Sequence, residues 1–260
     1  MKLLSQLFVL ALASSLAFGS LFSASSHVQM LDSKSFKKAM KTNQTSLVVY
    51  VTTSSGHCRH MAAEMDQASE KLHPLIPTYA VDCDNEKNKA LCAEEWVQKL
   101  PTVTLFPRGN TLTPTICPER KAAGVVKWTS SHIPDYVTQL SNIDDIESWK
   151  EKTKEETTLL LLTKEKKVPL LWRVLANKYS GRLELAAHWD EHGQAANDLG
   201  LDSNTKVLIY PAGDSRPVKY EGTTKYEPLT KFFDSILDGT ADIGTASEGQ
   251  KLSDRPDDEL

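Results

Sequence analysis

The sequence lacks an excess of charge, is poor in cysteine and has no metal-binding pattern, and each of these absences excludes a class of protein. Its 30 lysines and arginines nearly balance 34 aspartates and glutamates, so the net charge is −4. This balance gives no support for a nucleic-acid or anionic-membrane partner. Four cysteines in 260 residues are too few for a small disulfide-dense scaffold. Composition therefore indicates an ordinary globular protein with room for two domains.

Histidine is also sparse in any arrangement that binds metal. His57 and His60 flank Cys58. One thiol and two imidazoles on a single turn are more typical of a solvated helix start than of a zinc site. We expect neither a metal ion nor a cofactor.

Long apolar runs are missing except at the N-terminus. Lys2 precedes an apolar stretch from Leu3 to Phe22, in which serine, alanine and glycine are interspersed. The stretch is short for a membrane anchor, and small residues interrupt it. Residues 1–26 are therefore predicted to be a signal peptide, with cleavage between about residues 19 and 26 and no membrane span afterwards.

The C-terminal segment agrees with a secretory protein. Residues 239–260 are rich in Gly, Asp, Ser and Pro, and are expected to be disordered. They end in Asp257, Asp258, Glu259 and Leu260, which resembles the tetrapeptides that receptors read as retention in the endoplasmic reticulum. The two ends together predict the lumen of the endoplasmic reticulum and a retention receptor as a partner. Asn43 begins an N-x-T glycosylation triplet, usable only where its loop is exposed.

The chemically informative stretch lies between residues 48 and 61. An apolar, β-branched run from Val48 to Val51 predicts a buried strand. A turn of Thr, Ser and Gly follows, and then a helix that begins near Gly56 and carries Cys58. A thiol near a helix N-terminus is favoured as a thiolate. A dithiol redox site would have cysteine at both ends of this motif, whereas here the first position is Ser55.

The rest of the chain predicts strands and helices in alternation. In the first half we expect strands at 28–31, 47–52, 78–83, 102–106 and 125–128, and helices at 33–40, 56–73, 88–97 and 131–140, with Trp96 facing inward. In the second half we expect a polar strand-plus-helix entry at 143–154, strands at 158–163, 183–187, 206–210 and 218–222, and helices near 169–179, 194–199 and 229–237. This order predicts an α/β fold with two domains, about 27–141 and 142–238, each a mixed sheet flanked by helices.

Three motifs resemble the catalytic thioredoxin domain of protein disulfide isomerases. They are Ser55-Gly56-His57-Cys58, then Val81-Asp82-Cys83-Asp84 followed by Leu91-Cys92, and the segment Leu100 to Phe106 that contains Pro101. The segments Leu159 to Thr163 and Leu171 to Asn177 resemble the cysteine-free domain of small two-domain fungal members. The resemblance implies two tandem thioredoxin-like domains, and unfolded or misfolded secretory proteins as clients.

The same resemblance shows where this chain departs from the family. The family's attacking cysteine corresponds to Ser55, and its more buried releasing cysteine to Cys58. Serine cannot carry out thiol–disulfide exchange, which needs a thiolate and a sulfur leaving group. The tryptophan before the first cysteine is Ser54 here, and a buried glutamate and lysine correspond to Val49 and Ala80. An arginine that often follows the last strand is matched, loosely, by Lys127.

The resemblance also suggests roles for the remaining cysteines and for Pro101. Cys83 and Cys92 are expected to form a structural disulfide, and Cys117 either stays free or pairs with Cys58. Pro101 is expected to be cis. Beside it, Gly56 and His57 would bind an extended client segment, with Met61 and Val103 as an apolar surround.

Two functions remain open from the sequence. The first is a protein disulfide isomerase-like protein of the endoplasmic reticulum that assists oxidative folding, with at most monothiol isomerase activity through Cys58. The alternative is a redox-inactive chaperone or client-binding module that uses the groove beside Pro101.

Overall fold

A computed structural model describes residues 21–201, 207–214, 216–241 and 243. Most of the expected signal peptide lies outside the described residues. So do residues 244–260, with the expected retention signal Asp257–Leu260. No helix within the described ranges is both long and apolar enough to span a bilayer.

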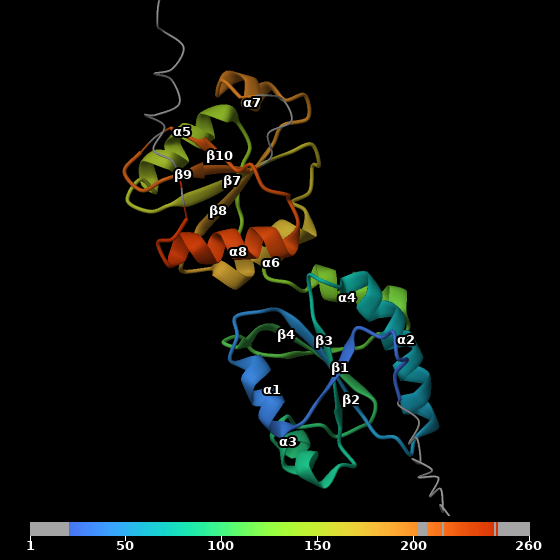
Figure 1. Cartoon of the computed structure of the whole chain (residues 1–260). Helices are drawn as coiled ribbons and strands as arrows, with labels where there is room; N and C mark the ends of the chain where they lie inside the picture. The colour runs from blue at the N-terminus through green and yellow to red at the C-terminus, as the bar shows by residue number, and fades with distance from the viewer. Residues whose placement is uncertain (1–20, 202–206, 215, 242, 244–260) are drawn as a thin grey trace, which may run out of the picture.

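The first domain is built on a five-stranded mixed sheet (Figure 1). Its strands lie in the order β1-β3-β2-β4-β5, with β1, β3 and β2 parallel and with β4 and β5 each antiparallel to its neighbour. The strands are β1 (Val28–Leu31), β2 (Ser46–Val51), β3 (Thr78–Asp82), β4 (Thr102–Asn110) and β5 (Thr115–Cys117).

Helices cover both faces of this sheet, so the central strand is buried on both sides. The helices are α1 (Ser33–Met40), α2 (Gly56–Leu72), α3 (Lys89–Glu94) and α4 (Ala122–Ser131), with a 3-10 turn at Glu86–Asn88. All six side chains of β2 are buried. Val49 and Val51 pack in the apolar cluster that contains residues of α2 and α4, whereas Val48 and Tyr50 pack with α1 and α3. This alternation is the two-residue period of a strand.

The second domain repeats the same topology. Its sheet has the order β10-β9-β7-β8-β6, and each strand pair has the direction of its counterpart in the first sheet. The strands are β6 (Thr138–Leu140), β7 (Thr158–Thr163), β8 (Glu184–Trp189), β9 (Val207–Tyr210) and β10 (Val218–Lys219). The helices are α5 (Ile143–Lys152), α6 (Leu170–Tyr179), α7 (Gln194–Asp198) and α8 (Tyr226–Leu237). The predicted fold class, α/β with two tandem thioredoxin-like domains, is confirmed.

The segment between the two sheets differs from its sequence prediction. The expected strand at 125–128 lies inside helix α4, whose Val125 and Thr129 face the core. The expected helix at 131–140 does not form. Pro134 disfavours helical backbone before it, and Thr138–Leu140 instead pair with β8 as a parallel edge strand. The second sheet therefore starts at Thr138, before the boundary expected at residue 141.

Trp96 also departs from its prediction. Helix α3 ends at Glu94, and Trp96 has a left-handed backbone with φ of 55°. Its side chain is 82% exposed rather than inward. The prediction assumed a helix up to residue 97. Because α3 ends at Glu94, helical spacing does not apply to Trp96.

Buried and partly buried hydrogen bonds join the two domains. The side-chain amide of Asn177, on α6, donates to the Thr45 hydroxyl at 2.8 Å and to the Pro107 carbonyl at 2.5 Å. Arg173, on the same helix, donates to the carbonyls of Ser130 and Ile133 at 3.1 and 2.5 Å. Figure 1 shows α6 and α8 on the side of the second domain that faces the first.

Candidate functional site

The motif lies in the tight connection from β2 to α2. Ser55 is the residue before the first turn of α2, with extended backbone, and its hydroxyl caps no amide among the described residues. Gly56 and His57 are exposed. Cys58, the third residue of the helix, turns into the core and is 0% exposed. The exposed end of the motif therefore has no sulfur, and its one sulfur is enclosed.

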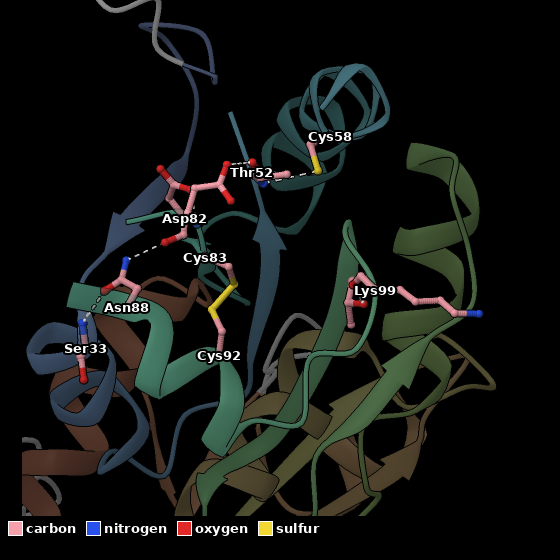
Figure 2. The surroundings of a disulfide bond; sticks show 10 residues. Ser33, Thr52, Cys58, Asp82, Cys83, Asn88, Cys92 and Lys99 are labelled. Carbon is pink, nitrogen blue, oxygen red and sulfur yellow. Dashed lines mark hydrogen bonds between the residues drawn. A yellow bond between two sulfur atoms is a disulfide. The ribbon is translucent and has the colours of Figure 1, made fainter. Parts of the chain in front are cut away.

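Cys58 is held by the backbone and by apolar side chains. The amide nitrogen of Thr52 donates to its Sγ at 3.4 Å (Figure 2). Val49 and Ala80 belong to the same apolar cluster, are fully buried and lie opposite each other in the register of β2 and β3. The resemblance places the family's buried ion pair at these two positions. Two apolar side chains there leave no carboxylate to accept a proton from the thiol.

An aspartate that the sequence analysis quoted in a motif, without giving it a role, fixes the turn before the active-site motif. Asp84 Oδ2 accepts hydrogen bonds from the hydroxyls of Thr52 and Ser54, the latter at 3.1 Å. Arg59 Nη1 donates to the Thr53 carbonyl at 3.2 Å. A signal existed in the sequence: β2 and β3 are parallel neighbours, so polar residues after their carboxyl ends meet. The turn is thereby ordered without the cysteine that the family has there.

Cys83 and Cys92 form a disulfide, with an S–S distance of 2.00 Å, between the end of β3 and helix α3 (Figure 2). Asn88 braces the same loop: its Nδ2 donates to the Asp82 carbonyl at 3.0 Å, and its Oδ1 accepts from the Ser33 amide at 3.1 Å. Cys92 packs in the cluster on the α1 and α3 face, whereas Cys58 packs on the α2 and α4 face. The disulfide is therefore structural and separate from the motif.

Cys117 does not pair with Cys58. Both are buried free thiols. Cys117 lies opposite Val103 in the ladder of β5 and β4, and Val103 lies opposite Val49. Burial raises the pKa of the Cys117 thiol. Of the two alternatives that the sequence left open for Cys117, the structure has the free thiol.

An open groove of about 550 Å³ lies beside the motif. Its lining consists of Gly56, His57, His60, Met61, Pro101 and Arg120. The peptide bond before Pro101 is cis. The fold thus brings together the predicted Gly56, His57, Pro101 and Met61, whereas Val103 is buried within the sheet.

Sequence reasoning missed two members of this lining, His60 and Arg120. Arg120 follows β5 by three residues, whereas Lys127 lies within helix α4. The proposed match of Lys127 to the family's arginine is therefore wrong, and Arg120 is the arginine after the last strand. The misplaced strand at 125–128 caused the error. His57 and His60 are both exposed, and the described residues contain no group of three or more ligands that could hold a metal ion.

The glycosylation triplet is partly accessible in the folded chain. Asn43 is half-buried and accepts a hydrogen bond from the Thr111 hydroxyl at 3.2 Å. Thr45 is fully buried, and its hydroxyl donates to the Pro107 carbonyl at 2.7 Å. The acceptor Asn43 is thus partly accessible while Thr45 is enclosed, and glycosylation of the triplet stays a prediction.

The comparisons with known proteins agree with this geometry. Residues 27–131 match the thioredoxin family. They form a thioredoxin domain, and the chain is homologous to fungal protein disulfide-isomerase-like proteins.

Two relatives illustrate how far the similarity extends. A mitochondrial thioredoxin domain-containing protein of Schizosaccharomyces pombe is 30% identical over 154 residues, which are 58% of this chain and 42% of the relative. The protein disulfide-isomerase MPD1 of Saccharomyces cerevisiae is 30% identical over 175 residues, which are 61% of this chain and 55% of the relative. The chain thus spans about half the length of these relatives. Among solved structures, a crystal structure of ERdj5 has a TM-score of 0.44 and 15% identity, covering 83% of this chain and 30% of that chain.

Proposed function

We propose that this chain is a protein disulfide isomerase-like protein of the endoplasmic reticulum that assists the folding of secretory proteins. It does so mainly by binding extended client segments in the groove beside Pro101. The observation that carries the proposal is the contrast within one motif. Gly56 and His57 line an open groove, while Cys58 is fully enclosed.

The groove beside Pro101 supports client binding. The absence of a cysteine at Ser55 supports weak redox chemistry. Thiol–disulfide exchange requires a thiolate that can attack a sulfur atom of the client's disulfide. Ser55 occupies the position from which such an attack would come, and Cys58 has no exposed surface. Binding needs only the groove and ordered backbone, and both are present at Pro101.

A monothiol isomerase is the second candidate. Isomerisation involves no net electron transfer, so one thiol is chemically sufficient. In the folded chain the Thr52 amide donates to Cys58 Sγ and the sulfur is enclosed. This candidate therefore requires a local opening that exposes Cys58.

Two assays on the full chain separate the candidates. The first follows recovery of activity from scrambled ribonuclease, and the second follows suppression of aggregation of a denatured, cysteine-free client. The binder predicts suppression of aggregation by the wild type and by Cys58→Ala alike, with no ribonuclease rescue by either. Ribonuclease rescue by the wild type that is lost in Cys58→Ala would establish the monothiol enzyme. Failure in both assays would contradict both candidates.

The location in the endoplasmic reticulum is proposed on the apolar run from Leu3 to Phe22 and the ending Asp257–Leu260. Deletion of the last four residues should shift the protein from the cell to the medium. A matched variant with the four residues in scrambled order should behave like the deletion. Retention that persists in both variants would contradict the role of this ending.

A further inference from the structure

The lining of the groove beside Pro101 combines apolar side chains with one arginine and two histidines. Met61 and Pro101 supply the apolar surface, and Gly56 leaves space, since a Cβ there would meet only the Arg59 guanidinium at 3.7 Å. His57, His60 and Arg120 complete the lining. None of the lining residues is acidic.

Arg120 has no acidic partner among the residues that the structure describes. Its Nη1 donates to the backbone carbonyls of Cys117 and Glu119 at 3.2 and 3.0 Å. These bonds fix the guanidinium and leave its charge uncompensated, because Arg120 forms no ion pair with any residue that the structure describes. The nearest acidic neighbour in sequence, Glu119, has its carboxylate against Gly124 of α4.

A second carboxylate near the groove, that of Glu64, already has partners within the protein. Glu64, one turn after His60 on α2, accepts hydrogen bonds from the Ala122 amide at 2.8 Å and from Lys121 Nζ at 3.0 Å. The amide and the ammonium hold the pKa of Glu64 below its ordinary value. The Glu64 carboxylate is therefore bound at the start of α4, where Lys121 and the Ala122 amide compensate its charge.

We propose that this groove selects client segments in which a carboxylate lies next to a large apolar side chain. The inference rests on the client-binding function proposed above and names its substrate class. The apolar side chain would pack on Met61 and Pro101, and the carboxylate would face Arg120, with His57 and His60 as further hydrogen-bond donors. Charge complementarity of this kind sets specificity more than affinity.

The test uses the full chain and three fluorescein-labelled peptides of identical length. One alternates two glutamates with two leucines between serine flanks, the second has glutamine for glutamate, and the third has lysine. Fluorescence anisotropy measures each Kd. The glutamate peptide should bind about two- to five-fold more tightly than the glutamine peptide, as expected for a solvent-exposed ion pair, and the lysine peptide should bind most weakly. The preference should diminish in 0.5 M salt.

Arg120→Gln should abolish the difference between the glutamate and glutamine peptides. Arg182→Gln is the matched control, because Arg182 is an exposed arginine of the second domain, and it should keep the full preference. Equal binding of all three peptides to the wild type would overturn the inference and leave client binding intact. If none of the three binds, client binding itself fails, which overturns the proposed function.

Discussion

The backbone amide of Thr52 and the sulfur of Cys58 are joined by a hydrogen bond of 3.4 Å, from the residue after β2 to the first turn of α2. This bond holds the only thiol of the motif inside the protein. Asp84 in turn ties the Thr52 and Ser54 hydroxyls to the end of β3. The motif is thus an ordered structure that lacks one sulfur.

This order predicts that a single substitution can rebuild a dithiol site. Ser55 precedes Cys58 by three residues, at the entrance of α2. After equilibration with oxidised glutathione, Ser55→Cys should form a disulfide with Cys58, seen by mass spectrometry as the loss of two hydrogens. It should also gain oxidase activity on reduced ribonuclease. Ser54→Cys is the control, and should retain a glutathione adduct instead. A stable adduct on Ser55→Cys would contradict the prediction.

The Cys83–Cys92 disulfide should stabilise the first domain without affecting the groove. It closes a loop with a sequence separation of 9 residues. Loop-closure entropy for a loop of this size predicts that the double variant Cys83→Ala/Cys92→Ala loses about 2 to 3 kcal/mol of unfolding free energy. Urea unfolding measures this loss. The peptide Kd should be unchanged, because the disulfide and Cys58 pack on opposite faces of the sheet. A weakened Kd in the folded variant would show coupling between the two faces.

Burial of Cys117 predicts a specific dependence of stability on alkaline pH. Its pKa is raised in the folded chain because the thiol is desolvated, whereas an unfolded thiol ionises near about 8.5. Above that pH the unfolded state releases a proton that the folded state keeps. The contribution of Cys117 to stability is therefore fully present below about pH 8.5 and is lost as the pH rises through the folded-state value.

Replacing the thiol tests this dependence. Between pH 7.5 and pH 10, the wild type should lose more unfolding free energy than Cys117→Val, with urea unfolding as the measurement. The ionisation of tyrosines is common to both proteins and cancels in the comparison. Equal losses would show that Cys117 ionises alike in both states.

Asn177 should couple the two domains. Its amide donates two hydrogen bonds, to Thr45 and to Pro107, and both bonds are buried. Asn177→Ala removes both bonds and should cost about 1 to 3 kcal/mol, with the single urea transition becoming broader or divided in two. Asn197→Ala, at an exposed position on α7, is the control and should change stability little. An unchanged transition in Asn177→Ala would mean that other contacts hold the domains together.

The sequence predicted those parts of the fold and site that local patterns determine. The apolar run Val48–Val51 and the run Leu159–Leu162 form central strands of the two sheets. Gly56, His57 and Pro101 meet in one groove although Pro101 is more than 40 residues distant in sequence. Recognisable motifs carried that long-range information. The spacing of apolar residues alone would not have predicted that Gly56 and His57 lie beside Pro101.

The missed features depend on packing that no short window contains. Residues 125–128 can form a strand or a helix by apolar spacing, and contact of α4 with α2 selects the helix. Arg120 could be assigned only after that helix was placed. Trp96 looks buried by its chemistry, but the end of α3 turns it outward.

The position of β6 has a practical consequence for dividing this protein. Thr138–Leu140 form the edge strand beside β8, and Arg173 binds the carbonyls of Ser130 and Ile133 in the preceding linker. A second domain expressed alone from residue 142 would start without its edge strand and expose the backbone of β8 to other chains. Expression from His132 would retain the strand and the Ile133 contact, so that the two fragments would differ in their tendency to aggregate.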